Sequence, residues 1–273
     1  MTADGPVAVT RIAADPGSGR PLVVLHGGGP GCHAEADFRA LLPLLPARDT
    51  VLVDLPGYGG TPLRRRPGPR FSGDADTLIG LLDALEVGEC DVLAQSLGGI
   101  VAMVVSARQP DRIRRLVAIG SQPVPAPAGI DVDATLGSRA RAAYYGGDAG
   151  PTAERLRQTV MALEWREPAA IPAQLLADRF AASVTPDGLA AAADPARLGA
   201  PEDLSALLDR VAADTLLVWG EYDPFGEPAY GQWLAGRLPR GFAVVVPAAA
   251  HHPQSELPEA TAALIEARLE PVR

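Results

Sequence analysis

One stretch in the first half of the chain encodes a strand, a sharp turn and a helix. The run from Cys90 to Gln95 is apolar in the manner of a buried strand, Ser96 follows it, and residues 100–105 form a helical apolar pattern. Such a tight turn brings its backbone close to neighbouring segments. The residues two before and two after the serine must therefore be small, and here they are Ala94 and Gly98. We therefore predict a nucleophile elbow, which holds a serine hydroxyl above a sheet. On this motif alone, an ordinary turn or helix cap is the alternative.

Short apolar runs alternate with helical patterns on both sides of this stretch. Runs typical of buried strands occupy residues 21–26, 50–54, 116–120, 215–219 and 242–246. Helical spacing occupies residues 36–45, 74–85, 228–237 and 258–269, and residues 7–12 fit a short edge strand. This alternation predicts an α/β fold, with a mostly parallel central sheet and helices on both of its faces.

The alternation stops between residues 122 and 204. Pro123, Pro125 and Pro127 indicate a stiff linker, and the chain after them is helical in pattern, most clearly at residues 160–165 and 171–182. Because strand patterns resume afterwards, we expect a core built from residues 1–121 and 205–273. Residues 122–204 would then be an inserted helical cap over the sheet, and a separate helical domain is the weaker alternative.

Composition narrows the classes of function. The chain has 273 residues, 47% of them hydrophobic, which suffices for a large core. Its net charge of −9 disfavours nucleic-acid and anionic-membrane partners, because both require clustered Lys and Arg. The one basic run, residues 64–66, fits a solvated loop.

The sequence indicates neither a metal centre nor a secreted or membrane protein. Cys32 and Cys90 form no CxxC or Cys/His cluster, so we expect no disulfide framework, no metal and no cofactor. Residues 1–6 lack the regions of a secretion signal, and no apolar run approaches the roughly 18 residues that span a membrane. We expect a cytoplasmic protein that acts on a small molecule.

Chemistry at Ser96 requires a base within hydrogen-bond reach and a group that orients the base. Asp223 follows a late strand and His251 follows the last one. Because the carboxyl ends of parallel strands meet at one edge of a sheet, we expect Ser96, Asp223 and His251 to gather there as a catalytic triad. Asp54 is the second choice for the acid, and Glu221 is more typical of a solvated turn.

Glycines after the first buried strand complete the predicted site. Attack on a carbonyl leaves negative charge on its oxygen, which pre-aimed backbone N–H groups stabilise. We expect one donor from Leu97, at the start of the elbow helix, and the other from Gly28. Gly27 and Gly29 would line the substrate pocket. His26, at the strand end, is expected to be structural.

These features together resemble the α/β-hydrolase superfamily over essentially the whole chain. The order Ser96, Asp223, His251 is the order of that superfamily's triad. His251 and His252 are both candidates for the base. Residues 250–259 also resemble the superfamily pattern small-His-x-x-x-x-Glu-x-Pro-Glu, which favours His251 as the base and leaves His252 to line the pocket.

Two segments narrow the resemblance. Residues 26–31, His-Gly-Gly-Gly-Pro-Gly, are similar to the oxyanion loop of meta-cleavage-product hydrolases and of prolyl aminopeptidases. Residues 171–179 are similar to the cap segment I-x-x-x-L-L-x-x-R of the first group. The resemblance implies that Arg179 binds the carboxylate of the substrate; an exposed helix arginine is the alternative.

The chain departs from that group at several pocket positions. Gln95, Leu97 and His252 stand where the group usually has Asn, Met and Trp, and Asp37 replaces a pocket Asn. We retain Gln95 and Asp37 as expected substrate-binding residues. An anionic Asp37 would be unfavourable beside a substrate carboxylate unless it points away. These changes affect substrate identity more than fold or triad.

The resemblance implies a cofactor-free hydrolase that cleaves a carbon–carbon bond of a vinylogous diketo acid, in a family whose members often form homo-oligomers. An ester, lactone or thioester hydrolase would need the same triad but not Arg179. A prolyl aminopeptidase would need acidic cap residues, for which Glu164 and Glu167 are available. Epoxide hydrolases and haloalkane dehalogenases would carry Asp at position 96. A non-catalytic ligand receptor on the same scaffold is the alternative from another class.

Overall fold

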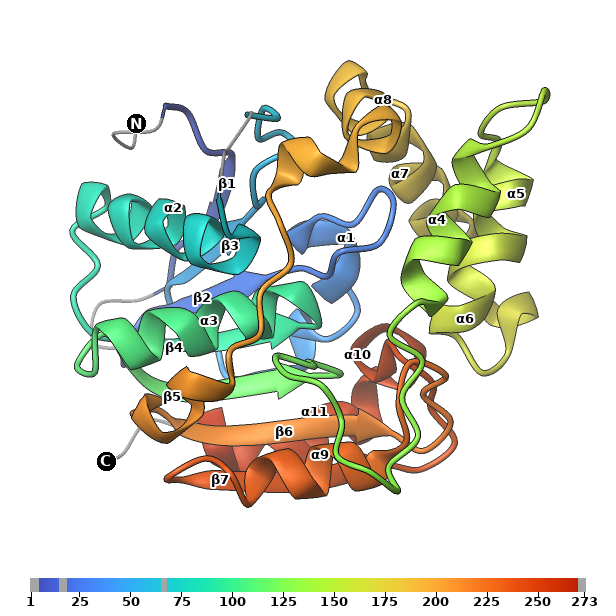
Figure 1. Ribbon diagram of the computed structural model, residues 1–273. Helices are drawn as coiled ribbons and strands as arrows, with labels where there is room; N and C mark the ends of the chain where they lie inside the picture. Colours follow the sequence, from blue (N-terminus) through green and yellow to red (C-terminus); the bar gives the residue numbers. More distant parts are fainter. Residues whose placement is uncertain (1–4, 15–18, 65–67, 270–273) are drawn as a thin grey trace.

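The computed structural model describes residues 5–14, 19–64 and 68–269, and its strands form one central sheet (Figure 1). The strands are β1 (Val9–Ile12), β2 (Leu22–Leu25), β3 (Thr50–Val53), β4 (Cys90–Gln95), β5 (Ile113–Ile119), β6 (Asp214–Gly220) and β7 (Gly241–Val246). Their spatial order is β1-β3-β2-β4-β5-β6-β7. The edge strand β1 runs antiparallel to β3, and every other pair in this sheet is parallel. The predicted α/β fold with a mostly parallel sheet is confirmed.

Helices cover both faces of the sheet. The helices are α1 (Ala34–Phe38), α2 (Arg70–Ala84), α3 (Leu97–Arg108), α4 (Leu136–Tyr145), α5 (Ala153–Leu156), α6 (Ala162–Glu164), α7 (Ala173–Ser183), α8 (Pro186–Ala193), α9 (Pro228–Ala235), α10 (Pro253–Glu256) and α11 (Pro258–Leu269). A π-helical turn at Arg157–Met161 leads into α6, and short 3₁₀ turns lie at Leu42–Leu44, Pro168–Ala170, Pro195–Leu198 and Ser205–Arg210.

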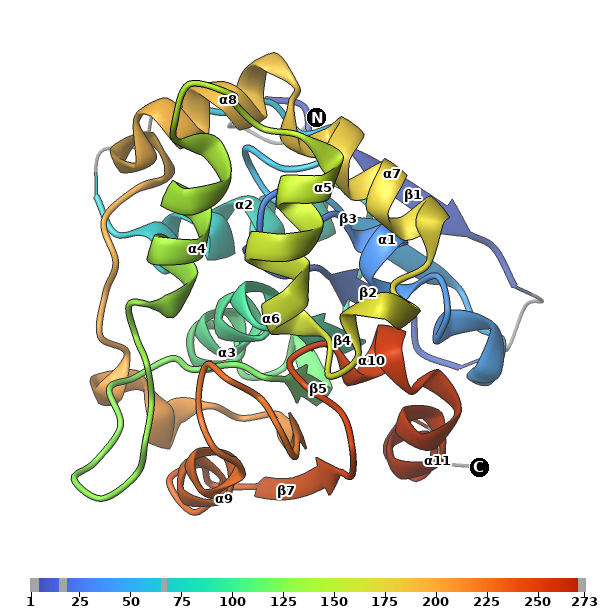
Figure 2. The same ribbon diagram turned by 90° about the vertical axis from the view of Figure 1, so that its right-hand side faces the viewer.

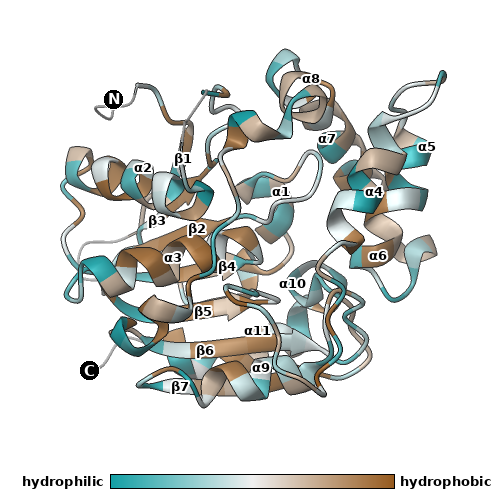
Figure 3. Cartoon of the chain, viewed as in Figure 1, coloured by the Kyte–Doolittle hydropathy of each residue, from teal (hydrophilic) through white to brown (hydrophobic). Residues whose placement is uncertain are grey.

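Alternate side chains along a strand point to opposite faces of the sheet and pack into different hydrophobic clusters. Val23 and Leu25 of β2 pack with α2, α3 and α9, whereas Leu22 and Val24 pack with α1 and α11 on the other face. Both faces are therefore buried, which is why these strands read as continuous apolar runs in the sequence. Figure 3 shows the resulting concentration of hydrophobic residues on the central strands and α3.

The segment between β5 and β6 contains α4 to α8. These helices group together beyond the carboxyl ends of the strands, and Figure 2 views the molecule from their side. They share a small apolar cluster of their own that includes Tyr144, Leu156 and Met161. We propose residues 122–204 as a cap and residues 1–121 with 205–273 as the core, in line with the sequence prediction.

Two helix predictions need correction. The single helix expected at residues 36–45 is instead the short helix α1 followed by a 3₁₀ turn, because Pro43 lacks the N–H that would continue an α-helix. The helix expected at residues 160–165 is a π-helical turn that runs into the short helix α6. The sequence pattern did not predict helix α4 individually.

Some predictions lie outside the described residues or stay untested. Arg65 and Arg66 of the basic run and residues 1–4 are not among the described residues. Within the described part of the chain, no helix combines the length and apolar character needed to cross a membrane. The expectations about assembly, nucleic acid and cellular location stay predictions.

Candidate active site

The turn between β4 and α3 holds Ser96 in a strained backbone conformation. Ser96 has φ 46° and ψ −108°, a region that non-glycine residues rarely occupy. Its N–H donates to the Ile119 carbonyl at 2.7 Å, and its own carbonyl accepts from the Ser121 hydroxyl at 2.9 Å. A Cβ at Gly98 would lie 2.6 Å from Cβ of Leu25, so glycine is required two residues after the serine. The predicted strand–serine–helix arrangement is present.

The loops after β6 and β7 bring an acid and a base together. Oδ2 of Asp223 lies 2.7 Å from Nδ1 of His251, and its Oδ1 accepts the N–H of Phe225 at 2.9 Å. Burial disfavours a charged His251, but the charge and hydrogen bond of Asp223 outweigh burial and raise the pKa of His251 above its ordinary 6.5. The Phe225 ring packs against the imidazole with centroids 4.3 Å apart. Asp223 therefore orients His251 and favours its protonated form.

Ser96 and His251 open onto the same cavity, whose volume is about 890 Å³. From the core, its wall includes Gly28, Gly29, Gln95, Ser96, His251 and His252. From the proposed cap, it includes Arg141, Val160, Leu163, Glu164 and Arg197. A cavity of this size accommodates a small organic substrate.

The glycine loop adjoins the start of α3. Gly28 lies close enough to Leu97 that a Cβ added to it would contact the leucine side chain at 3.4 Å. As the first residue of α3, Leu97 has a backbone N–H without an intrahelical acceptor. The Gly27 N–H donates to Oδ2 of Asp37 at 3.0 Å, and the Gly28 carbonyl accepts from the Tyr58 hydroxyl at 2.9 Å. Loop and helix start thus lie side by side as the oxyanion prediction requires.

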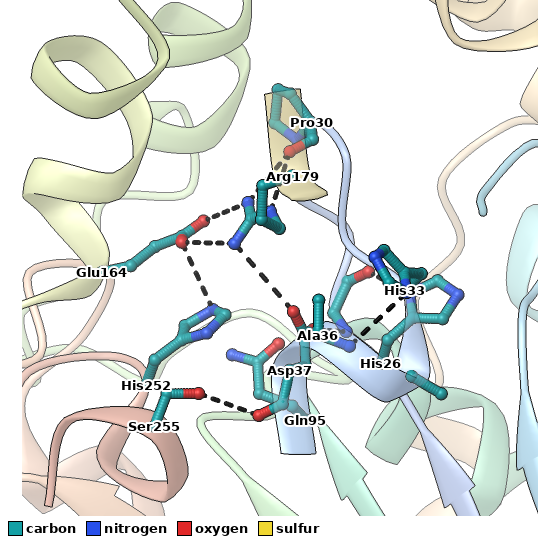
Figure 4. Close-up of polar contacts among 12 residues, drawn as sticks. His26, Pro30, His33, Ala36, Asp37, Gln95, Glu164, Arg179, His252 and Ser255 are labelled. Atoms are coloured by element: carbon teal, nitrogen blue, oxygen red, sulfur yellow. Dashed lines mark hydrogen bonds and ion pairs between the residues drawn. The ribbon is translucent and has the colours of Figure 1, made fainter. Parts of the chain in front are cut away.

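Arg179 lies in a buried network behind the glycine loop (Figure 4). Its NH1 and NH2 groups donate to the two carboxylate oxygens of Glu164 at 2.8 and 3.1 Å. Its Nε and NH2 also donate to the Pro30 carbonyl at 3.1 and 2.9 Å, and Asp37 lies 4.0 Å from NH1. The guanidinium therefore joins α7 of the proposed cap to the oxyanion loop.

Arg179 is paired with Glu164 within this network. Burial opposes ionisation of Glu164, but the charge of Arg179 outweighs it and lowers the pKa of the carboxyl to about 2. Burial lowers the pKa of His252, whose Nε2 lies 3.8 Å from Glu164. Arg179 is only 1% exposed and is not among the residues that line the cavity. It is neither the exposed helix arginine of the alternative nor an unpaired cation in the pocket; Glu164 lines the pocket instead.

The remaining predicted residues divide between pocket and support. Gln95 lines the cavity, and its Nε2 donates to the His251 carbonyl at 3.4 Å. Gly27 and Asp37 do not line the cavity; the hydrogen bond between them holds the glycine loop in place. Asp37 is therefore corrected from a pocket residue to a loop support, because its carboxylate accepts a backbone N–H. His26 is structural, since its Nε2 accepts the N–H of Leu55 at 2.9 Å.

Neither alternative acid serves His251. Asp54 accepts the N–H groups of Ala34 and Gly60, at 3.1 and 3.0 Å, and so holds two loops. Glu221 is exposed and accepts the N–H of Ala248 at 2.9 Å.

One buried group resembles a metal site in geometry. Ligand atoms of Cys32, Glu164 and His252 lie within 4.8 Å of one another. Both oxygens of Glu164 bond Arg179, and burial raises the pKa of the Cys32 thiol, so a cation there would face a guanidinium and a protonated thiol. These residues do not fit a metal.

Sequence reasoning missed several pocket residues. Tyr58, Arg70, Arg141 and Phe225 all line the cavity. Tyr58 belongs to the glycine-rich loop that follows β3, which signals proximity to the site, whereas Arg70 and Arg141 carry no motif.

Comparison with known proteins is consistent with this arrangement. Residues 21–258 match the family of the alpha/beta hydrolase fold. The chain is an α/β hydrolase. This α/β hydrolase is 33% identical over 252 residues to a pimeloyl-[acyl-carrier protein] methyl ester esterase of Neisseria meningitidis serogroup B, covering 91% of this chain and 92% of that protein.

Other relatives have a different named activity. A 2-hydroxymuconate semialdehyde hydrolase of a Pseudomonas species is 37% identical over 126 residues, which is 45% of this chain and 44% of that protein. The solved structure of a meta-cleavage product hydrolase, CumD, superposes with a TM-score of 0.80 at 21% identity, over 97% of this chain and 95% of that one. The resemblance stated from sequence is confirmed, and the chain is a hydrolase.

Proposed function

We propose that this α/β hydrolase cleaves a carboxylic ester, lactone or thioester through an acyl-enzyme at Ser96. The observation that carries this proposal is the pairing of Arg179 with Glu164 outside the cavity lining, because the arginine to which the resemblance assigns the carboxylate of a dienoate is already bound to a buried carboxylate. The full-length similarity to methyl ester esterases supports it.

The proposed reaction begins with Ser96 and His251. The serine Oγ attacks the substrate carbonyl carbon while Nε2 of His251 takes the hydroxyl proton. Asp223 holds Nδ1 of His251, fixes its tautomer and stabilises the imidazolium that forms. The negative charge on the former carbonyl oxygen is stabilised by the N–H groups of Gly28 and Leu97, each worth about 3 kcal/mol in comparable sites, and by the N-terminus of α3.

Collapse of this intermediate releases the alcohol or thiol. His251 returns its proton to the leaving group, and Ser96 keeps the acyl group as an ester. A water molecule that gives its proton to His251 then attacks the acyl carbon, and release of the acid restores both residues. No cofactor takes part in these steps.

Hydrolysis of a carbon–carbon bond is the second candidate. It is favoured by the glycine loop and by the partial similarity to a 2-hydroxymuconate semialdehyde hydrolase. In that reaction a dienolate would first become a ketone, with His251 moving the proton. Attack at the remote carbonyl, by Ser96 or by water that it activates, would then release an acid and a 2-hydroxydienoate.

Two substrates separate the candidates. A short p-nitrophenyl ester and a chromogenic dienoate ring-fission product are compared with the wild type and with Arg179→Met. We expect turnover of the ester and none of the dienoate. Turnover of the dienoate by the wild type would overturn the ester proposal in favour of carbon–carbon cleavage, and its loss in a folded Arg179→Met would assign the substrate carboxylate to Arg179.

A fluorophosphonate probe tests whether the protein is a catalyst at all. The activated Ser96 is expected to take the label in the folded wild type and Ser96→Ala is expected to remain unlabelled. A folded wild type that resists the probe would instead support a non-catalytic receptor.

A further inference from the structure

Among the described residues, three arginines that the proposed reaction does not use line the cavity. Arg70 begins α2, Arg141 lies on α4, and Arg197 lies in the 3₁₀ turn that follows α8. Arg70 contributes from the core, whereas Arg141 and Arg197 contribute from the proposed cap. The cavity thus receives positive charge from both parts of the chain.

Arg141 has no carboxylate partner among the described residues. Its guanidinium carbon lies 5.3 Å from the centroid of the Tyr145 ring, and its Nε is buried without a hydrogen-bond acceptor in that part of the chain. The neighbouring Arg139 on α4 is different, since it is exposed and forms an ion pair with Asp133 at 2.7 Å. Arg141 is therefore a cation turned into the cavity with unused donor capacity.

Arg70 is also incompletely paired. Its NH2 donates to the Tyr58 hydroxyl at 2.8 Å, and Asp74 lies 3.9 Å from its Nε, beyond hydrogen-bond distance. That Nε is buried without an acceptor. Two cavity arginines thus each present a buried donor that no described protein group satisfies, although buried donors are normally hydrogen-bonded.

Tyr58 fixes the position of this cationic wall relative to the reacting centre. The Tyr58 hydroxyl that accepts from Arg70 donates in turn to the Gly28 carbonyl at 2.9 Å. Arg70 therefore lies two hydrogen bonds from the predicted oxyanion loop. Apolar side chains of Ile100, Val160 and Leu198 also line the cavity. This arrangement suits an apolar chain with a reacting carbonyl at one end and an anion at the other.

The acidic residues of the cavity do not cancel these charges. Glu164 is bonded to Arg179, and Asp133 is bonded to Arg139. Asp194 is exposed.

We propose that Arg70 and Arg141 form an anion subsite, and that the natural substrate is an ester whose acyl chain ends in a carboxylate or a phosphate. This inference rests on the proposed ester hydrolysis and names its substrate class. Arg141 would bind the anion directly. Arg70 would bind it while also holding Tyr58 against the glycine loop.

The test compares matched esters with and without the terminal charge. Mono-p-nitrophenyl esters of the diacids from adipate to azelate are each paired with the p-nitrophenyl ester of the uncharged monoacid of equal length. We expect kcat/KM of the wild type to favour the diacid ester about tenfold or more at one chain length. An ester that ends in a phosphonate at this length decides between the two anions, since the larger ratio identifies the better ligand.

Variants of two arginines of the proposed cap locate the subsite. Arg141→Met is expected to remove the diacid preference. Arg157→Met is the control and is expected to retain it, because Arg157 pairs with Glu154 and does not line the cavity. Arg141→Glu is expected to reverse the preference toward an ester that ends in an ammonium group. Isothermal titration with suberate provides a readout that needs no turnover: we expect binding to the wild type and to Arg157→Met, with a loss of about tenfold or more in Arg141→Met.

The results that would contradict the anion subsite differ from those that would contradict ester hydrolysis. Equal turnover of charged and uncharged esters at every length, or a preference that survives Arg141→Met, would overturn the subsite and leave ester hydrolysis standing. Absence of turnover with every ester would overturn the ester proposal, and suberate titration would then decide the subsite. Failure of suberate to bind would refute the subsite in that case.

Discussion

The hydrogen bond between Asp223 and His251 sets the pH range in which the proposed base is available. His251 must be neutral to accept the Ser96 proton, and its pKa is raised above 6.5 because Asp223 outweighs burial. Activity should therefore fall as the pH drops through this raised pKa. In Asp223→Asn we expect the acid limb of the kcat/KM profile to move to lower pH and the rate to fall about 10³- to 10⁴-fold.

Glu221 provides the control for that profile. It lies two residues from Asp223 but is exposed and contacts Ala248, so Glu221→Gln should keep the wild-type acid limb. An acid limb that is the same in Asp223→Asn and the wild type would contradict the role of Asp223.

Gly120 gives a second prediction at a single residue. Its φ is +56°, and a Cβ there would lie 2.8 Å from Cε1 of His251. Gly129 also has a positive φ, +88°, but a Cβ there would meet nothing within 4 Å. Both Gly→Ala changes should lower the free energy of unfolding by about 1–2 kcal/mol through backbone strain. Gly120→Ala alone should also lower kcat, by up to about 10²-fold, by displacing His251.

Chemical denaturation and kcat measurements on the two glycine variants check this. Equal kcat values for Gly120→Ala and Gly129→Ala would show that His251 tolerates the intrusion.

At the scale of elements, a buried ion pair joins α6 and α7 to the glycine loop. Glu164→Gln leaves the charge of Arg179 without its main partner and should cost about 3–5 kcal/mol of unfolding free energy. The double variant Glu164→Leu/Arg179→Met should recover part of that loss, because neither charge of the pair remains, whereas Asp37 and the Pro30 carbonyl still lose their contacts with Arg179. The exposed pair Arg157–Glu154 is the control, and Glu154→Gln should change stability little. Thermal and denaturant unfolding measure all three.

The same pair predicts a pH dependence of stability. The folded-state pKa of Glu164, about 2, lies below its ordinary 4.5, so its contribution is present above about pH 4.5 and is lost as pH falls toward 2. Glu164→Gln should therefore show a shallower loss of stability than the wild type in that range. Parallel stability curves would mean that the carboxyl is not held ionised by Arg179.

The sequence predicts those parts of the site that depend on where strands end, and it does not predict those that depend on how helices pack. Ser96, Asp223 and His251 each follow a strand, and the strands β4 to β7 run parallel. Their shared direction predicts that the three residues lie at the same edge of the sheet. The pairing of Arg179 with Glu164 depends on how α6 and α7 pack, and spacing within one helix carries no information about a partner from another. Arg70 and Arg141 were missed for the same reason: their position in the cavity depends on tertiary packing.

At the scale of the whole molecule, the fold does not determine the substrate. A similar fold occurs in a meta-cleavage product hydrolase, and full-length sequence similarity extends to methyl ester esterases. The charges around the cavity are therefore the features of this chain that bear on its substrate. Arg179 is paired with Glu164 outside the cavity lining, whereas Arg70 and Arg141 line the cavity and have unused hydrogen-bond donors.

The acyl-enzyme at Ser96 is the central claim for the whole molecule, and its mass is the most direct measurement. Wild type and Ser96→Ala are mixed with a short p-nitrophenyl ester, quenched with acid during the first turnovers, digested and analysed by mass spectrometry. We expect the peptide that contains Ser96 to gain the mass of the acyl group in the wild type. Ser96→Ala should gain no acyl mass and should lose about 10³-fold or more in kcat. Steady turnover by a Ser96→Ala protein, or acylation at another residue, would contradict the account.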